Sequence, residues 1–174
     1  MQIPLVMTII GPDRPGLVEL LAGLVVEHGG NWLESRMSHL GGHFAGILRI
    51  LIPAERQEAF VKALRSIDPR QLTVVVHADE SLPQQPVETL ARLEIVGHDR
   101  PGIVRQISQA LSQYGVNVEE LHTECESAPM SGETLFKAKA TLHIPASCKV
   151  SELRARLEKI AQDLMVDFSF QQLH

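Results

Sequence analysis

GPDRPGLV, at residues 11–18, recurs 86 positions later as GHDRPGIV, at residues 97–104. The similarity extends beyond this octapeptide, because nine of 24 positions are identical between residues 11–34 and 97–120. Further along, the tripeptide Ile-Pro-Ala at residues 52–54 recurs at residues 144–146. Self-similarity at a roughly fixed spacing is the signature of a duplicated structural unit. The 174-residue chain is therefore predicted to be a tandem duplication.

Each half shows the same order of predicted elements. A short apolar stretch precedes the octapeptide in each half, at residues 3–10 and 89–96, which predicts a buried strand. Helices are predicted next, over residues 17–25 and 101–114, and Gly29-Gly30 ends the first of them. Two strands, a second helix and a last strand complete each half. In the first half they are predicted over residues 32–40, 44–52, 54–66 and 72–77. In the second half they are predicted over residues 118–126, 134–144, 150–164 and 165–170.

This order of elements predicts an α+β fold made of two ferredoxin-like βαββαβ repeats. Both helices of a repeat have one apolar stripe to bury, so they should cover one face of an antiparallel four-stranded sheet. We expect a first domain over residues 1–80, a linker over residues 81–88, where Pro and Gln are frequent, and a second domain over residues 89–174. Free edge strands allow a homodimer, with pairing of the two repeats of one chain as the alternative.

Composition limits the partners of the chain. Its 16 Lys and Arg against 21 Asp and Glu give a net charge of −5, and both halves are acidic, so neither has the basic surface that a phosphate backbone requires. Aromatic residues, at 4%, are too few for base stacking. No apolar run is long enough to span a bilayer, and the N-terminus does not resemble a secretory signal. We expect a cytoplasmic protein that binds neither nucleic acid directly nor a membrane.

The repeated turn lies between the first strand and the first helix of each half. Asp13 is expected to accept hydrogen bonds from free amides at the helix start, and Pro15 to pre-set the first turn. Gly16 is expected to let a second backbone or a small ligand approach closely. The helix N-terminus suits a carboxylate, and Asn31 and Asn117 are expected to add an amide at the same edge. A purely structural turn that binds nothing is the alternative.

The string Gly-x-Asp-Arg-Pro-Gly-[Leu/Ile]-Val, followed by Gly-x-Asn at the next strand, resembles the ACT domain. The resemblance covers nearly the whole chain, as two repeats without an attached catalytic domain. It implies regulatory modules of βαββαβ fold that pair side by side and bind amino acids at the interface. Carried over by position, the ligand-contacting residues that it implies are Gly11, Asp13, Arg14, Pro15, Gly16 and Asn31, with Gly97, Asp99, Arg100, Pro101, Gly102 and Asn117 in the second half.

A stand-alone pair of such repeats resembles regulators that sense glycine and restrain a DNA-bound transcriptional activator through protein contact. An acidic chain without a helix-turn-helix has to act through such a protein partner. The halves differ next to the motif, with Pro12 against His98 and Trp32 against Val118, so they need not bind the same ligand. The alternative is a constitutive protein-interaction module without a small-molecule ligand.

Catalysis and metal binding are not expected. The sequence contains no nucleophile elbow, P-loop, zinc-protease motif or dinucleotide-binding motif, so we predict neither an enzyme nor a cofactor. His122 and Cys125 are three positions apart on a predicted strand and should point to opposite faces, which argues against a metal site. Cys125 and Cys148 are expected to act as small apolar residues, although a redox role stays open.

Overall fold

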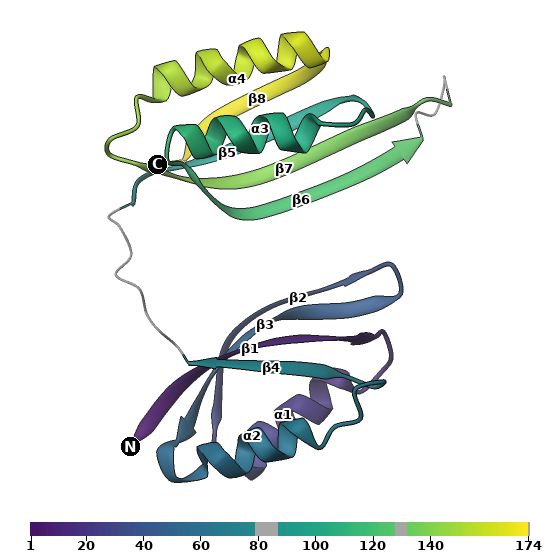
Figure 1. The fold of residues 1–174 in the computed structure, drawn as a ribbon, viewed down its shortest axis with the longest axis vertical. Coiled ribbons are helices and arrows are strands. Elements are labelled where there is room, and N and C mark those ends of the chain that lie inside the picture. The colour runs from purple at the N-terminus through teal and green to yellow at the C-terminus, as the bar shows by residue number, and fades with distance from the viewer. Residues whose placement is uncertain (79–86, 128–131, 174) are drawn as a thin grey trace. The chain divides into compact units, whose positions relative to one another are not determined.

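The computed structural model divides the chain into two compact units, Met1–Leu82 and Pro83–His174 (Figure 1). It describes residues 1–78, 87–127 and 132–173. Each unit has four strands and two α-helices in the order β-α-β-β-α-β. The predicted fold class is confirmed, since each unit is an antiparallel four-stranded sheet with helices in the ferredoxin-like order.

The first unit follows the predicted ranges closely. The sequence predicts one helix over residues 54–66, but its first three residues form a short 3-10 helix after Pro53, as is common where a helix begins. The elements are β1 (Gln2–Pro12), α1 (Leu17–Glu27), β2 (Asn31–Leu40), β3 (His43–Pro53), η1 (Ala54–Arg56), α2 (Gln57–Arg65) and β4 (Thr73–Ala78).

The second unit repeats this order. Its first helix begins two residues after the predicted start, because Gly102 has a φ of +99°, which an α-helix does not accept. Of the predicted linker, residues 81–86 lie outside the described residues, and residues 87–88 belong to the first strand of this unit. The elements are β5 (Val87–His98), α3 (Ile103–Gln113), β6 (Asn117–Ser127), β7 (Thr134–Pro145), α4 (Val150–Leu164) and β8 (Val166–Leu173).

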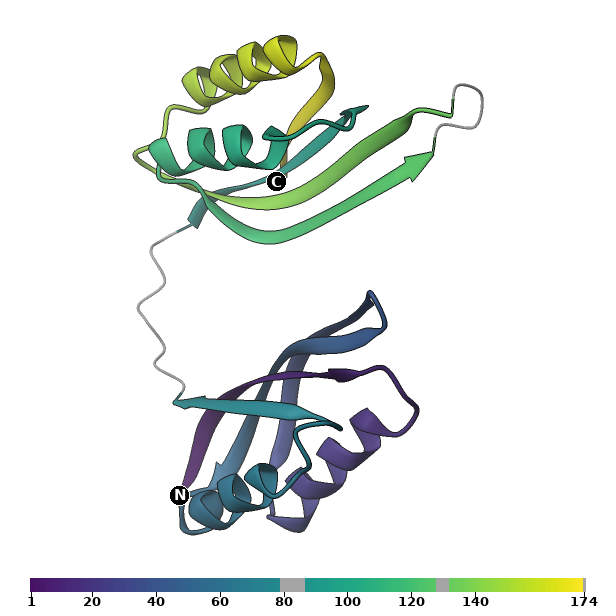
Figure 2. The ribbon, with the colours of Figure 1, turned by 45° about the vertical axis from the view of Figure 1, so that its right-hand side comes forward.

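The two sheets have the same topology. Their strand orders are β2-β3-β1-β4 and β6-β7-β5-β8, and every neighbouring pair is antiparallel. Because β1 and β2 both pair antiparallel with β3, they run in the same direction and end at the same end of the sheet. Figure 2 shows the two helices of each unit on one face of its sheet, as predicted.

Each core lies between the sheet and the two helices. Strand residues alternate, so Leu5, Met7 and Ile9 of β1 are buried against the helices while the residues between them face away. In α4 the apolar residues at helical spacing, Leu153, Leu157, Ile160 and Leu164, are buried. No polar or charged side chain is buried among the described residues. Hydrophobic burial is therefore the main source of stability in both cores.

The sheet faces that the helices leave open differ between the units. In the first unit this face carries exposed apolar side chains, among them Ile10, Ile47 and Val75. In the second unit it carries charges on neighbouring strands, with Glu124 of β6 opposite Lys137 of β7. The edge strand β6 is exposed at each of its residues. Among the described helices, none is long and apolar enough to cross a membrane.

Leu48→Ala tests the first core, because Leu48 is completely buried at the centre of β3. We expect the free energy of unfolding to fall by about 2–5 kcal/mol, through lost burial and the cavity left behind. Urea denaturation followed by circular dichroism measures it. Leu40→Ala is the matched control, since Leu40 is 82% exposed and its loss should cost less than about 0.5 kcal/mol. Similar losses in both variants would contradict this packing.

Candidate functional site

Each copy of the turn ends on a glycine with a left-handed backbone. Gly16, with a φ of +90°, directly precedes α1, and Gly102, with a φ of +99°, precedes α3. The carbonyl oxygen of Gly16 accepts the first helical hydrogen bond, from the Leu20 N–H at 2.9 Å. The close approach of a second backbone expected at Gly16 is not found among the described residues, because a Cβ there would meet none of their atoms within 4 Å. Its backbone angle, and not crowding, requires a glycine.

The predicted capping role of Asp13 is wrong. No side chain caps α1 or α3, because the residue next to each helix is a glycine and the aspartate lies three positions earlier. The main chain of the aspartates has another role: the Asp13 N–H donates to the Gly42 carbonyl and the Asp99 N–H to the Thr134 carbonyl, both at 2.9 Å. Each turn is therefore fixed to the β2–β3 or β6–β7 segment beside it.

The glycine that begins the motif is required by crowding. A Cβ on Gly11 would lie 2.5 Å from the Gln71 carbonyl oxygen, and one on Gly97 would lie 2.9 Å from the Val166 Cα. Both distances are too short for real atoms, so only glycine fits at the end of the first strand of each unit, where residues at or directly before the start of the last strand lie alongside it.

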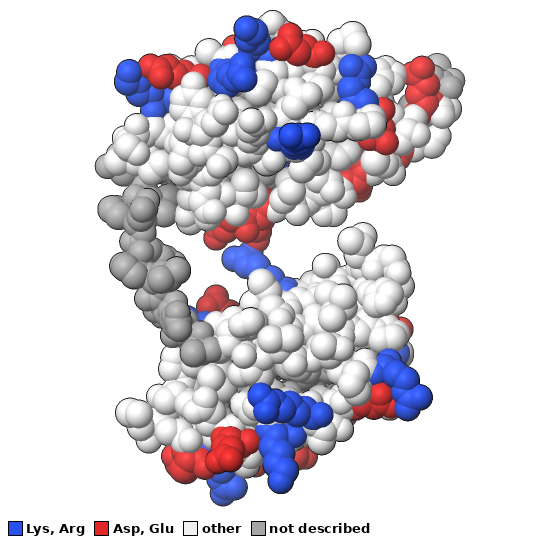
Figure 3. Space-filling view, viewed as in Figure 1, with Lys and Arg blue, Asp and Glu red and all other residues white. Residues whose placement is uncertain are grey.

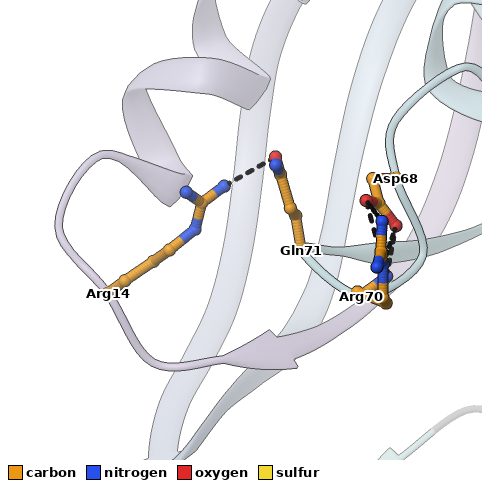
Figure 4. A network of polar contacts seen from close by, with 4 residues as sticks. All are labelled: Arg14, Asp68, Arg70 and Gln71. Carbon is orange, nitrogen blue, oxygen red and sulfur yellow. Dashed lines mark hydrogen bonds and ion pairs between the residues drawn. The ribbon is translucent and has the colours of Figure 1, made fainter.

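Both charged side chains of the first turn have partners within the unit. Asp13 Oδ2 lies 2.9 Å from His39 Nδ1 at the end of β2. The Arg14 guanidinium donates to Gln71 Oε1 at 3.0 Å, as Figure 4 shows. The loop that carries Gln71 is itself held by Asp68, whose carboxylate accepts hydrogen bonds from the Arg70 N–H and guanidinium. These bonds hold the pKa of Asp68 below its usual value.

The second turn has different surroundings. Among the described residues, neither the Asp99 carboxylate nor the Arg100 guanidinium has a hydrogen-bond or ion-pair partner. The ion pair at this turn joins His98 Nδ1 to Glu133 at 3.4 Å. Asp99, Pro101 and Gly102 are exposed, and Arg100 is half-buried. The charged groups of this turn are thus accessible to a ligand.

The structure separates Asn31 and Asn117 from the turns of their own units. Gly11 pairs with Phe44 at one end of β3, whereas Asn31 pairs with Leu51, seven residues further along the same strand. Seven residues of strand span roughly 23 Å. Asn117 and Gly97 are separated in the same way along β7. The prediction that the asparagines lie at the same edge as the turn is therefore wrong within one unit, because the sheet topology places them at opposite ends.

Comparison with known families identifies both units. Models of the ACT domain match residues 4–77 and residues 87–162. The chain belongs to the ACT domain family. The two ACT matches together cover most of the chain and coincide with the two folded units. ACT domains are regulatory, amino-acid-binding modules, so membership supports a regulatory, amino-acid-sensing role.

Similarity to other proteins extends over nearly the whole chain. The glycine cleavage system transcriptional repressor of Escherichia coli (strain K12) is 22% identical over 162 residues, which cover 92% of this chain and 85% of that protein. A protein of unknown function from Galdieria sulphuraria has a TM-score of 0.85 at 26% identity and covers 100% of both chains. A crystal structure provisionally assigned as a glycine cleavage system transcriptional repressor has a TM-score of 0.72 at 18% identity, covering 99% of this chain and 98% of that one.

An apolar hollow adjoins the second ACT turn. It lies between α3 and the edge strand β6, and it begins at Ile103, the first residue after the turn. Val104, Val118 and Leu121, which are all exposed, form its outer part. Beside the charged turn, this ACT domain therefore exposes an apolar surface.

The histidines and cysteines do not form a metal centre in the part of the chain that the structure describes, where no three His, Cys, Asp or Glu side chains gather. His122 and Cys125 lie opposite Lys139 and Phe136 on β7, so they point to opposite sheet faces, as predicted. Burial raises the pKa of the Cys148 thiol, which favours its unreactive protonated form.

Gly16→Ala and Gly102→Ala test the left-handed turns. We expect each change to lower the free energy of unfolding by about 1–2 kcal/mol, because an alanine side chain strains a positive φ. Gly23→Ala is the matched control, since Gly23 lies inside α1 with open space at its Cβ, and there alanine should add about 0.5–1 kcal/mol. Urea denaturation measures all three variants, and a stabilising effect at Gly16 or Gly102 would contradict the described backbone.

Proposed function

We propose that this protein is a non-catalytic, amino-acid-sensing regulator. The observation that carries the proposal is the pair of ACT domains, at residues 4–77 and 87–162. The similarity to the glycine cleavage system transcriptional repressor supports a finer proposal, in which the ligand is glycine and the output is repression of glycine cleavage genes.

The chemistry of the ACT turn suits a free amino acid. An α-amino acid carries a carboxylate and an ammonium group on one carbon. Each turn presents an arginine and an aspartate at consecutive positions, followed by a helix whose first N–H groups have no side-chain cap. Guanidinium and helix N–H groups bind carboxylates, and an aspartate binds an ammonium group. The turn therefore has a partner for both charges of the ligand.

We propose that the asparagines contact the ligand from a second ACT domain. Asn31 lies about 23 Å from its own turn along the sheet, so a ligand cannot contact both within one domain. If edge strands of two chains pair antiparallel, the start of one strand lies at the end of the sheet where the other chain has its turn. We therefore propose a homodimer in which glycine stabilises the paired state and so changes the surface offered to a partner.

The proposed partner is a DNA-bound transcriptional activator, contacted as a protein. The net charge of −5 disfavours direct contact with DNA. In the face shown in Figure 3, Lys and Arg side chains lie in small groups next to Asp and Glu side chains. Control of transcription would then depend on protein contact.

A constitutive interaction module is the second candidate. It is favoured by the first turn, where Asp13 and Arg14 already have partners and Gly16 is required by its backbone angle alone. In such a module the repeated motif would serve the fold and no amino acid would bind.

Thermal unfolding in the presence of each of the twenty amino acids at millimolar concentration separates the two candidates. A sensor should be stabilised selectively, and glycine at 100 times its dissociation constant should add about 2.7 kcal/mol. Calorimetric titration with glycine and serine then gives the affinity and stoichiometry. No shift with any amino acid would reject the sensor and leave the constitutive module.

Glycinamide and acetate are the matched controls, because each carries only one of the two charges of glycine. We expect neither to shift the unfolding temperature at the concentration at which glycine does. An equal shift with acetate would show a general anion effect and not recognition of an amino acid.

A further inference from the structure

The two ACT turns share the sequence Asp-Arg-Pro-Gly and the same backbone, but they differ in what their charged side chains contact. In the first turn, Asp13 is paired with His39 and Arg14 with Gln71. In the second turn, Asp99 and Arg100 have no partner among the described residues. The motif alone does not explain this difference, so its cause lies in the surrounding positions.

His39 is positioned to hold Asp13. It is opposite Phe44 near the end of the β2–β3 pair, and its Nε2 accepts the Gly42 N–H at 3.3 Å. A neutral imidazole that accepts at one nitrogen carries its proton on the other, so Nδ1 donates to Asp13 Oδ2 at 2.9 Å. The Asp13 carboxylate is thus already occupied by a hydrogen bond, and in this sense His39 closes one side of the first turn.

Gln71 closes the other side. Its loop is held by the bonds between Asp68 and Arg70, and by the Gln71 N–H, which donates to the Asp68 carbonyl at 2.8 Å. The close approach at Gly11 then holds the Gln71 main chain against the end of β1, and the Gln71 side chain reaches Arg14 (Figure 4).

Sulfur-containing residues replace both side chains in the second unit. Cys125 lies opposite Phe136 as His39 lies opposite Phe44, and Phe136 and Phe44 pair with the equivalent glycines Gly97 and Gly11. In the same way, Met165 directly precedes Val166, which lies beside Gly97, as Gln71 directly precedes Leu72, which lies beside Gly11. Thiol and thioether groups are weak hydrogen-bonding partners, so neither can hold a carboxylate or a guanidinium.

We propose that the second turn is the amino-acid site, with Arg100 binding the carboxylate and Asp99 the ammonium group, and that His39 and Gln71 close the first turn. This inference rests on the proposed sensor function and names the domain that performs it. A ligand at the first turn has to displace two contacts, and each exposed contact of this kind weakens binding by up to about five-fold. Together they disfavour the first turn by up to about twenty-five-fold.

Calorimetric titration with glycine, using charge-removing variants in each turn, tests the assignment. Wild type should bind one glycine per chain. Arg100→Met and Asp99→Asn should each weaken binding at least ten-fold, because each removes a charged partner of the ligand. The matched changes Arg14→Met and Asp13→Asn should leave the affinity within about two-fold. Circular dichroism and unfolding curves check that every variant is folded.

The double variant His39→Cys, Gln71→Met removes both side-chain partners of the first turn and puts in their place the residues found at the equivalent positions of the second unit. We expect a second glycine to bind, so that the stoichiometry rises from one to two per chain. An unchanged stoichiometry would overturn the closing role of the two side chains. Loss of binding in the Arg14 or Asp13 variants with normal binding in the Arg100 variant would overturn the assignment. If wild type is stabilised by none of the twenty amino acids, the sensor function itself fails.

Discussion

The close approach of two backbones at Gly11 and Gly97 is the constraint on which the rest of each domain depends. At this point the start of the last strand lies alongside the end of the first strand, too close for any side chain on the glycine. In the first unit this close approach holds Gln71 within reach of Arg14, 57 positions earlier in the sequence. In the second unit Met165 stands at the equivalent position, directly before Val166, the register partner of Gly97.

Duplication has kept the backbone and changed its neighbours. Both turns retain the glycine with a left-handed backbone, the hydrogen bond donated by the aspartate main-chain N–H, and the glycine that begins the motif, because each of these is required for the fold. His39 and Cys125 occupy equivalent positions, as do Gln71 and Met165, and the fold does not require a particular side chain at either. Residues around the turn can therefore change, and with them the access of a ligand to the turn, while the fold stays the same.

Local patterns in the sequence were sufficient to predict the elements, their order and the fold, because strand and helix periodicity depend on near neighbours. They do not predict contacts between segments that are far apart in the sequence. Asn31 and the turn of its unit are close in sequence but lie at opposite ends of the sheet, and Gln71 meets Arg14 across 57 positions. The capping role given to Asp13 failed because Gly16 occupies the capping position. Aligning the repeats beyond the motif would have revealed the His39 and Gln71 differences, but not their contacts.

Strand β6 has a consequence for self-assembly. It presents eleven exposed residues at a sheet edge, the kind of surface that can template cross-β stacking. Glu120, Glu124 and Glu126 alternate along one of its faces. If a second β6 aligns in parallel register, identical carboxylates meet; if it aligns antiparallel about His122, Glu120 meets Glu124. Repulsion repeated at every layer disfavours growth into in-register fibrils, whereas a single antiparallel pair of β6 strands stays possible, because Lys137 pairs with Glu126 and His122 lies 3.8 Å from Glu124.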